Sequence, residues 1–265
     1  MDSLQELVEQ KIAGVAAEYA RRPGVHTAWK PPLVAYADAH DPLFAQLKEV
    51  IRPSHATPTE LLPAAQTVIT FFLPFVESVA RGNREEQYAS EAWAVAYVET
   101  NDLIRTISAR LAEVLEAQGW AAAVLPPTHN FDTQSLMSDW SHKHVAYVAG
   151  LGQFGLHRML ITRQGSCGRL GSLVTSARLA PTPRSTQAAC LYTHNRSCTA
   201  CLQRCPAGAL AEDGFDRQAC YALCLQNADR NRQRGLADVC GKCVSVVPCS
   251  FRDPVAALLE KASAA

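Results

Sequence analysis

Hydrophobic and polar positions in the N-terminal part of the chain switch between helical and strand-like spacing. Apolar residues recur at helical spacing from Leu4 to Arg21, and again in a long Ala-rich stretch from Glu85 to Gln118. We expect Gly119 to end this second helix, and a break near Asn101 to divide it. The continuous apolar run from Thr67 to Val76 predicts a buried strand. This mixture is typical of an α/β or α+β domain.

Shorter elements are predicted between and after these segments. Asp41 and Pro42 predict a helix start, with Asp41 as N-cap and Pro42 as the first helical residue. A further helix is expected over 139–148, and short strands over 121–125, 159–162 and 170–175. The Pro-rich segment 180–186 predicts a linker. We therefore expect two domains, residues 1–185 and residues 186–265.

Composition and charge narrow the class of protein. Hydrophobic residues make up 48% and charged residues 19%, which is globular rather than disordered composition. Lys+Arg and Asp+Glu both number 25, so the global charge indicates no nucleic-acid or membrane partner. The N-terminal residues form an acidic amphipathic pattern without the basic and apolar regions of a signal peptide. The apolar run at Thr67 is too short to span a bilayer. We expect a soluble cytoplasmic protein that binds neither nucleic acid nor a membrane.

Ten cysteines indicate a metal-binding function. In a reducing compartment, closely spaced cysteines are more often metal ligands than disulfide partners. Cys167 stands apart in a GSCG turn, where we expect a free structural thiol. Two groups carry recognisable spacing, a C-x2-C-x3-C-P run at 198–206 and a C-x2-C pair at 240–243. The nine clustered cysteines are Cys190, Cys198, Cys201, Cys205, Cys220, Cys224, Cys240, Cys243 and Cys249.

The spacing predicts two 4Fe-4S clusters. A C-x2-C turn places two thiolates on adjacent corners of a cubane, and the cysteine before proline ligates the other cluster in two-cluster proteins. The standard bacterial run has a cysteine where this chain has Asn195, so Cys190 is expected to replace it from a longer loop. Either Cys220 or Cys224 completes the second set. The predicted sets are Cys190, Cys198, Cys201 and Cys249 for one cluster, and Cys205, Cys240, Cys243 and Cys220 or Cys224 for the other.

Zinc is the alternative reading of the same pattern. Cys198, Cys201, Cys240 and Cys243 could form a single four-cysteine zinc site. That site would leave five clustered cysteines without a role, and it would not explain the Cys-Pro pair at 205–206. We therefore favour two iron–sulfur clusters.

A glycine motif and an uneven charge distribution precede the cysteines. Gly150-x-Gly152-x-x-Gly155 matches a dinucleotide fingerprint, but a helix-like segment precedes it and no acidic residue follows at the required distance. We expect these glycines to let the backbone approach a flat cofactor closely. No acidic residue lies between Asp139 and Glu212, whereas lysines and arginines are frequent there. This charge could balance anionic clusters or bind an anionic substrate or a cofactor phosphate. The cations are Lys143, Arg158, Arg163, Arg169, Arg178, Arg184, Arg196 and Arg204.

Together these motifs resemble one known family. AGLGQFGLHRMLIT and GSCGRLGSLVTS, followed by C-x2-C-x3-C-P, resemble the core and cluster domain of the epoxyqueuosine reductases, which are similar to the reductive dehalogenases. LLPAAQTVITFFLPF resembles an early strand of that family. The resemblance covers about residues 60 to 250. It implies base-off cobalamin in a nitroreductase-like domain, followed by a small ferredoxin-like domain whose clusters supply electrons to cobalt.

The resemblance also implies a set of cofactor-binding residues around the glycine motif. Trp140 and Tyr147 could stack on the corrin, although at helical spacing such aromatic residues are more often part of the core. The expected residues are Ser138, Trp140, His142, His144, Tyr147, Gly150, Leu151, Gly152, Phe154, Gly155, Leu156 and His157.

The chain departs from the family at the expected catalytic acid. The family places this acid further upstream, in a D-x-x-P context, whereas the nearest acid here is Asp139. We take Asp139 as the candidate general acid, with His142 or His144 behind it, and a helix N-cap as its alternative role. The family members that act on tRNA continue into helical repeats after the clusters, and this sequence stops at Ala265. We therefore expect a small-molecule substrate.

Three functions remain open at this point. A cobalamin-dependent reductase would receive electrons from an external donor such as a flavodoxin or ferredoxin. A flavin-dependent reductase on the same scaffold would hold FMN instead. An electron-transfer or redox-sensing protein would hold clusters alone.

Overall fold

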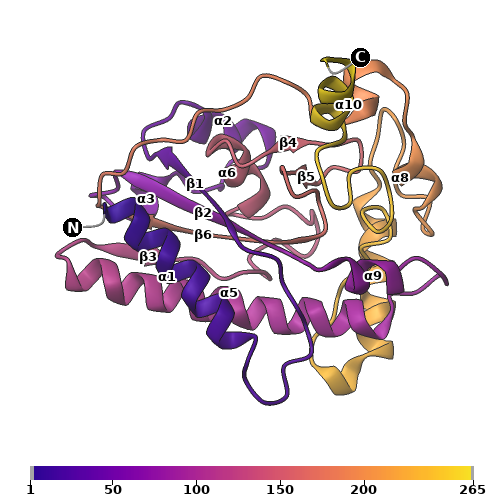
Figure 1. Ribbon diagram of the computed structural model, residues 1–265, viewed down its shortest axis with the longest axis horizontal. Helices are drawn as coiled ribbons and strands as arrows, with labels where there is room; N and C mark the ends of the chain where they lie inside the picture. The colour runs from indigo at the N-terminus through magenta and orange to yellow at the C-terminus, as the bar shows by residue number, and fades with distance from the viewer. Residues whose placement is uncertain (1–2, 264–265) are drawn as a thin grey trace.

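A four-stranded antiparallel sheet organises the N-terminal part of the molecule (Figure 1). The computed structural model describes residues 3–263. The strand order is β1 (Leu33–Asp38), β2 (Thr67–Pro74), β6 (Gly168–Thr175) and β3 (Ala122–Val124). Every residue of β2 is buried, because helices cover both faces of the sheet. The apolar run at Thr67 is therefore a buried strand, as predicted.

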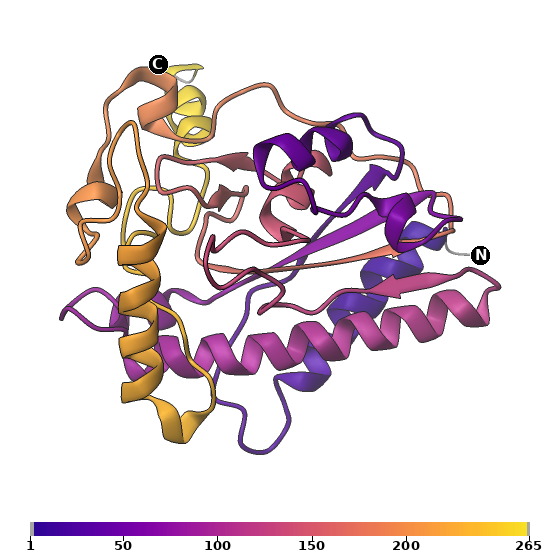
Figure 2. The same ribbon diagram turned by 180° about the vertical axis from the view of Figure 1, so that it is seen from behind.

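Helices α1 (Leu4–Tyr19) and α5 (Glu91–Ala117) cover one face, and α2 (Leu43–Val50) and α6 (His142–Val148) cover the other (Figures 1 and 2). Side chains of a strand alternate between its two faces. Thus Ile69 and Phe71 pack with α1 and α5, while Val68 and Phe72 pack with α2 and α6. The hydrophobic core is therefore split into two layers by β2.

The remaining elements are short, and most lie in the C-terminal part. None of the helices within residues 3–263 is long and apolar enough to cross a membrane. The elements are α3 (Pro58–Leu61), α4 (Glu77–Gly82), the pair β4 (Gln153–Phe154) and β5 (Leu160–Ile161), α7 (Leu191–Asn195), α8 (Ala200–Gln203), α9 (Arg217–Arg230), η1 (Arg232–Arg234) and α10 (Pro254–Ser263).

The mixed α/β class is confirmed, but two predicted helix details are wrong. Helix α5 runs unbroken for 27 residues, because Asn101 lies inside its buried face and does not interrupt the apolar stripe. Helix α2 begins at Leu43, with Pro42 rather than Asp41 at the N-cap. The Asp41 carboxylate still accepts the Leu43 N–H at 3.0 Å, so it stabilises the same helix end from one position earlier.

The cysteine-rich part is packed against the end of the sheet where α5 begins (Figure 1). Trp93 of α5 lies in one hydrophobic cluster with Phe75, Cys167 and Val244. The segment 180–186 has no regular structure, as a linker would, but Thr182 exchanges hydrogen bonds with Tyr36 of β1. The two predicted domains therefore share packed side chains, and the boundary at residue 185 stays a prediction.

Gly241 provides a test of this packing. Its φ is +68°, and a Cβ at this position would lie 2.2 Å from the ring of Trp93. We expect Gly241→Ala to lower the free energy of unfolding by about 1–3 kcal/mol, because neither the ring nor the backbone can yield without strain. Chemical denaturation measures the change.

Gly14→Ala is the matched control, because Gly14 lies within α1 and a Cβ there meets nothing within 4 Å. This substitution should instead stabilise the chain by about 0.5–1 kcal/mol. Equal effects of the two substitutions would contradict the packing of Gly241 on Trp93.

Candidate functional site

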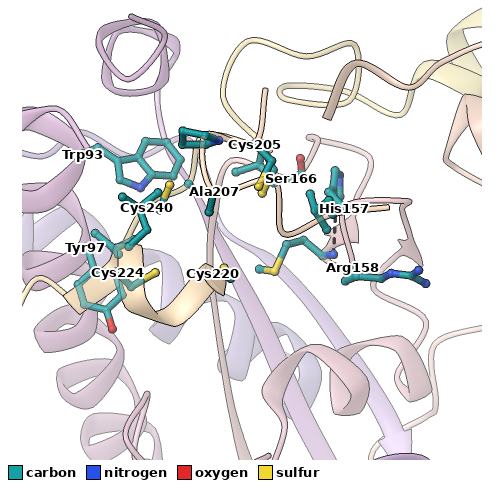
Figure 3. A pocket seen from close by; sticks show the side chains of 18 of the residues that line it. Trp93, Tyr97, His157, Arg158, Ser166, Cys205, Ala207, Cys220, Cys224 and Cys240 are labelled. Atoms are coloured by element: carbon teal, nitrogen blue, oxygen red, sulfur yellow. Dashed lines mark hydrogen bonds between the residues drawn. The ribbon is translucent and has the colours of Figure 1, made fainter. Parts of the chain in front are cut away.

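The nine clustered cysteines line two cavities. The small cysteine cavity, of about 20 Å³, is lined by Cys190, Cys198, Cys201 and Cys249. The large cysteine cavity, of about 340 Å³, is lined by Cys205, Cys220, Cys224, Cys240 and Cys243 (Figure 3). The structure thus brings together the two predicted ligand sets. Within residues 3–263, no three cysteine, histidine or carboxylate side chains are close enough to hold a single metal ion.

The small cysteine cavity is built from short local elements. Cys190 is the N-cap residue of α7 and Cys201 lies in α8. Burial raises the pKa of Cys201 to about 11, and the neighbouring thiols of Cys190 and Cys198 add to the effect. Asn195, at the position of the standard cysteine, uses its side chain to accept the Ser197 N–H at 3.1 Å. Cys190 therefore lies beside Cys201 although it comes from a longer loop.

In the large cysteine cavity, Cys220 and Cys224 lie one turn apart on α9. Burial raises the pKa of Cys240 to about 11, and Cys220 and Cys205 are the thiols that add to it. Burial raises the pKa of Cys243 as well, and the thiols of Cys240, Cys220 and Cys205 add to this effect. Cys224 lines the same cavity from the next turn of α9.

The large cysteine cavity extends beyond its thiols to a buried polar group. The Tyr97 hydroxyl donates to Asp238 at 2.7 Å, and the His129 ring nitrogen Nε2 lies 2.9 Å from the second oxygen of Asp238. The Arg169 guanidinium lies 4.1 Å from the centre of the Tyr97 ring, and its buried Nε has no hydrogen-bond partner within residues 3–263. Asp238 was not among the residues predicted from the sequence. Its position two residues before Cys240 was the one feature that could have indicated it.

Lys143 links this cavity to a smaller one. Its ammonium group donates to the carbonyl of Arg158 at 3.1 Å, and burial lowers the pKa of Lys143 to about 8. Lys143 also lines an adjoining cavity of about 140 Å³ that contains His142. Both ring nitrogens of His142 have partners, the Ser172 hydroxyl at 2.8 Å and the Pro126 carbonyl at 2.9 Å. Burial lowers the pKa of His142 to about 4, so its ring is neutral.

The aromatic residues predicted to stack on a corrin are instead packed in the protein core. Trp140 is 3% exposed, stacks on Phe44 and His55, and donates its indole N–H to Ser172 at 2.9 Å. Tyr147 packs against Phe154 at the edge of the same hydrophobic cluster. Packing in the hydrophobic core therefore describes these two residues better than stacking on a corrin.

The glycine motif brings the chain close to itself rather than to a flat cofactor. A Cβ on Gly152 would lie 2.4 Å from the carbonyl oxygen of Ile161, and one on Gly155 would lie 2.8 Å from the His157 ring. Gly150 has a φ of +77° and approaches the carbonyl of Pro183. The space that these glycines leave open is filled by the protein. These contacts alone require glycine at the three positions, and the close approach to a cofactor stays a prediction.

The other predicted cofactor-binding residues are dispersed. His144 bonds the Ser141 hydroxyl at 2.7 Å and packs on Phe154. Leu151 lies in the core, and Ser138 forms an isolated bridge with Phe131. Leu156 packs beside Cys190 and Cys201. His157 lines both cysteine cavities.

Asp139 does not face either cysteine cavity. Its carboxylate accepts the Ser54 hydroxyl at 2.6 Å and lies 3.4 Å from the Arg52 guanidinium, with 55% of the side chain exposed. The N-cap of α6 is Ser141, so Asp139 does not cap this helix either. This placement supports neither of the two roles considered for it.

Comparison with known proteins identifies a relative. No family model matches the chain. An epoxyqueuosine reductase from Alicycliphilus denitrificans is 28% identical over 182 residues, which are 65% of this chain and 48% of the relative. The chain is similar to epoxyqueuosine reductases. It spans about half the length of the curated relatives it matches.

Solved structures share the fold of this chain. An epoxyqueuosine reductase with an epoxyqueuosine-modified tRNA stem loop has a TM-score of 0.56 and 21% identity, covering 94% of this chain and 66% of that one. A catabolic reductive dehalogenase has a TM-score of 0.57 and 14% identity, covering 84% and 30%. The first structure contradicts our expectation of a small-molecule substrate without nucleic acid, since a neighbour in this fold binds RNA.

Asp238 and Asp139 can be compared directly by mutation. Asp238→Ala removes a nearly buried carboxylate and leaves the Tyr97 hydroxyl and the His129 ring without this partner. We expect a loss of about 1–3 kcal/mol in the free energy of unfolding. Asp139→Ala removes a half-exposed carboxylate that pairs with Arg52 and accepts the Ser54 hydroxyl, and it should cost about 0–1 kcal/mol. Chemical denaturation measures both losses. A larger loss in Asp139→Ala than in Asp238→Ala would contradict this description of the cavity.

Proposed function

We propose that this chain is an iron–sulfur oxidoreductase whose two 4Fe-4S clusters pass electrons to a ligand in the large cysteine cavity. One observation carries the proposal. The cysteines gather in two cavities with at least four thiols each, and the larger cavity continues past its thiols to Tyr97, Arg169 and Asp238. The relatives are named as reductases, which agrees with an oxidoreductase.

The number and grouping of the thiols match the ligands of two cubanes. Each cluster supplies one-electron transfer when bound, and needs four cysteine thiolates. For the second cluster we propose Cys220 as the ligand, because burial raises the pKa of both Cys240 and Cys243 and the Cys220 thiol adds to this rise in each of them. Cys224 would then be a fifth thiol beside the cluster. The proposed sets are Cys190, Cys198, Cys201 and Cys249, and Cys205, Cys220, Cys240 and Cys243.

Matched serine substitutions on α9 test this assignment. After anaerobic reconstitution we expect about eight iron atoms per chain in the unchanged protein. Cys220→Ser should lose about half of this iron, because the second cluster lacks a ligand, whereas Cys224→Ser should keep nearly all of it. Iron and sulfide analysis gives the answer. Loss of iron only in the Cys224 variant would reverse the assignment.

We propose that the large cysteine cavity would enclose only part of a corrinoid. The relatives imply cobalamin beside the clusters. However, cavities of about 300–1,000 Å³ enclose drug-sized ligands, and a corrinoid is larger than these. The 340 Å³ of this cavity must also accommodate the second cluster. We therefore derive no step through cobalamin. Adding cobalamin or FMN to the reconstituted protein, followed by desalting and absorption spectroscopy, separates a corrinoid reductase, a flavin reductase and a carrier with clusters alone.

A proton for the ligand would come from the Tyr97 hydroxyl. This hydroxyl lies in the cavity wall, where it donates its hydrogen to Asp238. It would turn from Asp238 to the ligand to transfer that proton. Burial raises the pKa of Tyr97, so the oxygen holds its proton at neutral pH. The Arg169 cation over the ring would stabilise the anion left after proton transfer. Asp139 lies outside this arrangement.

For the substrate we propose a nucleoside within RNA. The RNA-bound neighbour supports this class, as does the absence of acidic residues between Asp139 and Glu212 in the sequence. Several arginines of that segment are exposed, which suits contact with phosphates. These arginines are Arg163, Arg178, Arg184 and Arg196.

Binding of an epoxyqueuosine-modified tRNA stem loop tests the substrate class. We expect binding in low salt that weakens on the order of tenfold or more between about 50 and 200 mM salt, because phosphate contacts release counterions. Fluorescence anisotropy measures the affinity. The unmodified stem loop is the control and should bind more weakly. A lack of binding by either stem loop in low salt would reject an RNA substrate.

A further inference from the structure

His157 lies in the wall between the two cysteine cavities. Within residues 3–263, it is the only residue that lines both of them. Its side chain is 3% exposed and packs closely on Gly155, where a Cβ would lie 2.8 Å from the ring carbon Cε1. The ring is therefore held in one place without contact to bulk water, between the positions proposed for the two clusters.

The hydrogen bonds of His157 determine which nitrogen carries its proton. The Met159 backbone N–H donates to Nδ1 at 3.0 Å, so Nδ1 is an acceptor and has no hydrogen of its own. The ring proton is therefore on Nε2, because a neutral imidazole carries one N–H. Nε2 lies 3.3 Å from the Cys249 sulfur. His157 thus donates an N–H···S hydrogen bond to a cysteine of the small cysteine cavity.

The acceptor sulfur is also held in place. The Cys249 carbonyl accepts the Ser166 backbone N–H at 2.9 Å and the Ser166 hydroxyl at 3.0 Å. Donor and acceptor are thus both fixed by backbone contacts. Neither has to reorganise when an electron arrives.

We propose that His157 raises the reduction potential of the cluster in the small cysteine cavity through its hydrogen bond to Cys249. Reduction adds negative charge that spreads onto the cysteine sulfurs, and an N–H donor stabilises the reduced state more than the oxidised state. The proposal rests on the proposed function, since it requires a cluster bound by Cys249. His157 acts as a positioning residue for electron transfer, and the cluster performs the redox change.

Two substitutions in the full-length reconstituted protein separate the hydrogen bond from the volume of the ring. His157→Phe keeps the ring but removes the donor. His157→Gln places an amide N–H near the position of Nε2. Redox titration followed by electron paramagnetic resonance reports the potential of each cluster.

We expect His157→Phe to lower the reduced fraction of one cluster at a fixed potential on the order of tenfold, about 59 mV for one electron. The other cluster should keep its potential, and His157→Gln should recover most of the loss. His144→Phe is the matched control. His144 is a partly buried histidine on α6 that lines neither cysteine cavity, so both potentials should stay unchanged.

A direct measurement covers the case in which a variant does not fold. In the unchanged protein labelled with ¹⁵N-histidine, pulsed electron paramagnetic resonance should detect one histidine nitrogen coupled to a reduced cluster. Clusters that show no such coupling, or potentials that His157→Phe does not change, would overturn the role of His157 alone. Failure of the unchanged protein to assemble clusters at Cys249 would overturn the proposed function together with this role.

Discussion

The close backbone contact between residues 165–167 and residues 249–250 determines where the cysteine loops lie. Gly165 has a φ of +85°, and a Cβ there would lie 2.3 Å from the Ser250 carbonyl oxygen, so only glycine allows this approach. The next two residues use their N–H groups to bond the carbonyls of Cys249 and Ser250, and the Cys167 thiol donates to the Val244 carbonyl at 3.0 Å. The Cys167 carbonyl accepts from Phe75 at the end of β2. The sheet and the cysteine loops are thereby joined through one short segment.

This contact gives a physical reason for the GSCG motif at residues 165–168, which from the sequence alone supported only a family resemblance. The GSCG turn precedes β6, whose first residues lie at the large cysteine cavity. Cys167 is 1% exposed, and burial raises its pKa to about 12, so it is a structural thiol as expected. The turn therefore does not supply a ligand. It holds the Cys249 loop beside the sheet, which brings Ser166 and His157 to that cysteine.

The sequence predicted the elements of the fold and the cysteine groups better than it predicted the cavity. The spacing of the cysteines reflects local turns, so even the displaced Cys190 could be assigned to its group. Cys220 and Cys224 could not be separated, because residues four apart on a helix share one face. Tyr97 and Asp238 meet across 141 positions of sequence, and no local pattern connects them. The glycine motif was misinterpreted because a close approach of the chain to itself and one to a cofactor require the same residue.

The cations near the cysteines divide into two groups by their surroundings. Lys143 is partly buried beside the large cysteine cavity; burial lowers its pKa, and the Cys220 and Cys243 thiols act in the opposite direction. Lys242, within the second C-x2-C pair, is 2% exposed and is similarly influenced by Cys240. These lysines are positioned to balance the negative charge that thiolates bring into a poorly solvated space. Arg163 and Arg196, from the acid-free segment, are exposed and lie outside that cavity. Balancing thiolate charge therefore suits the two lysines, while the exposed arginines are available to a polyanion.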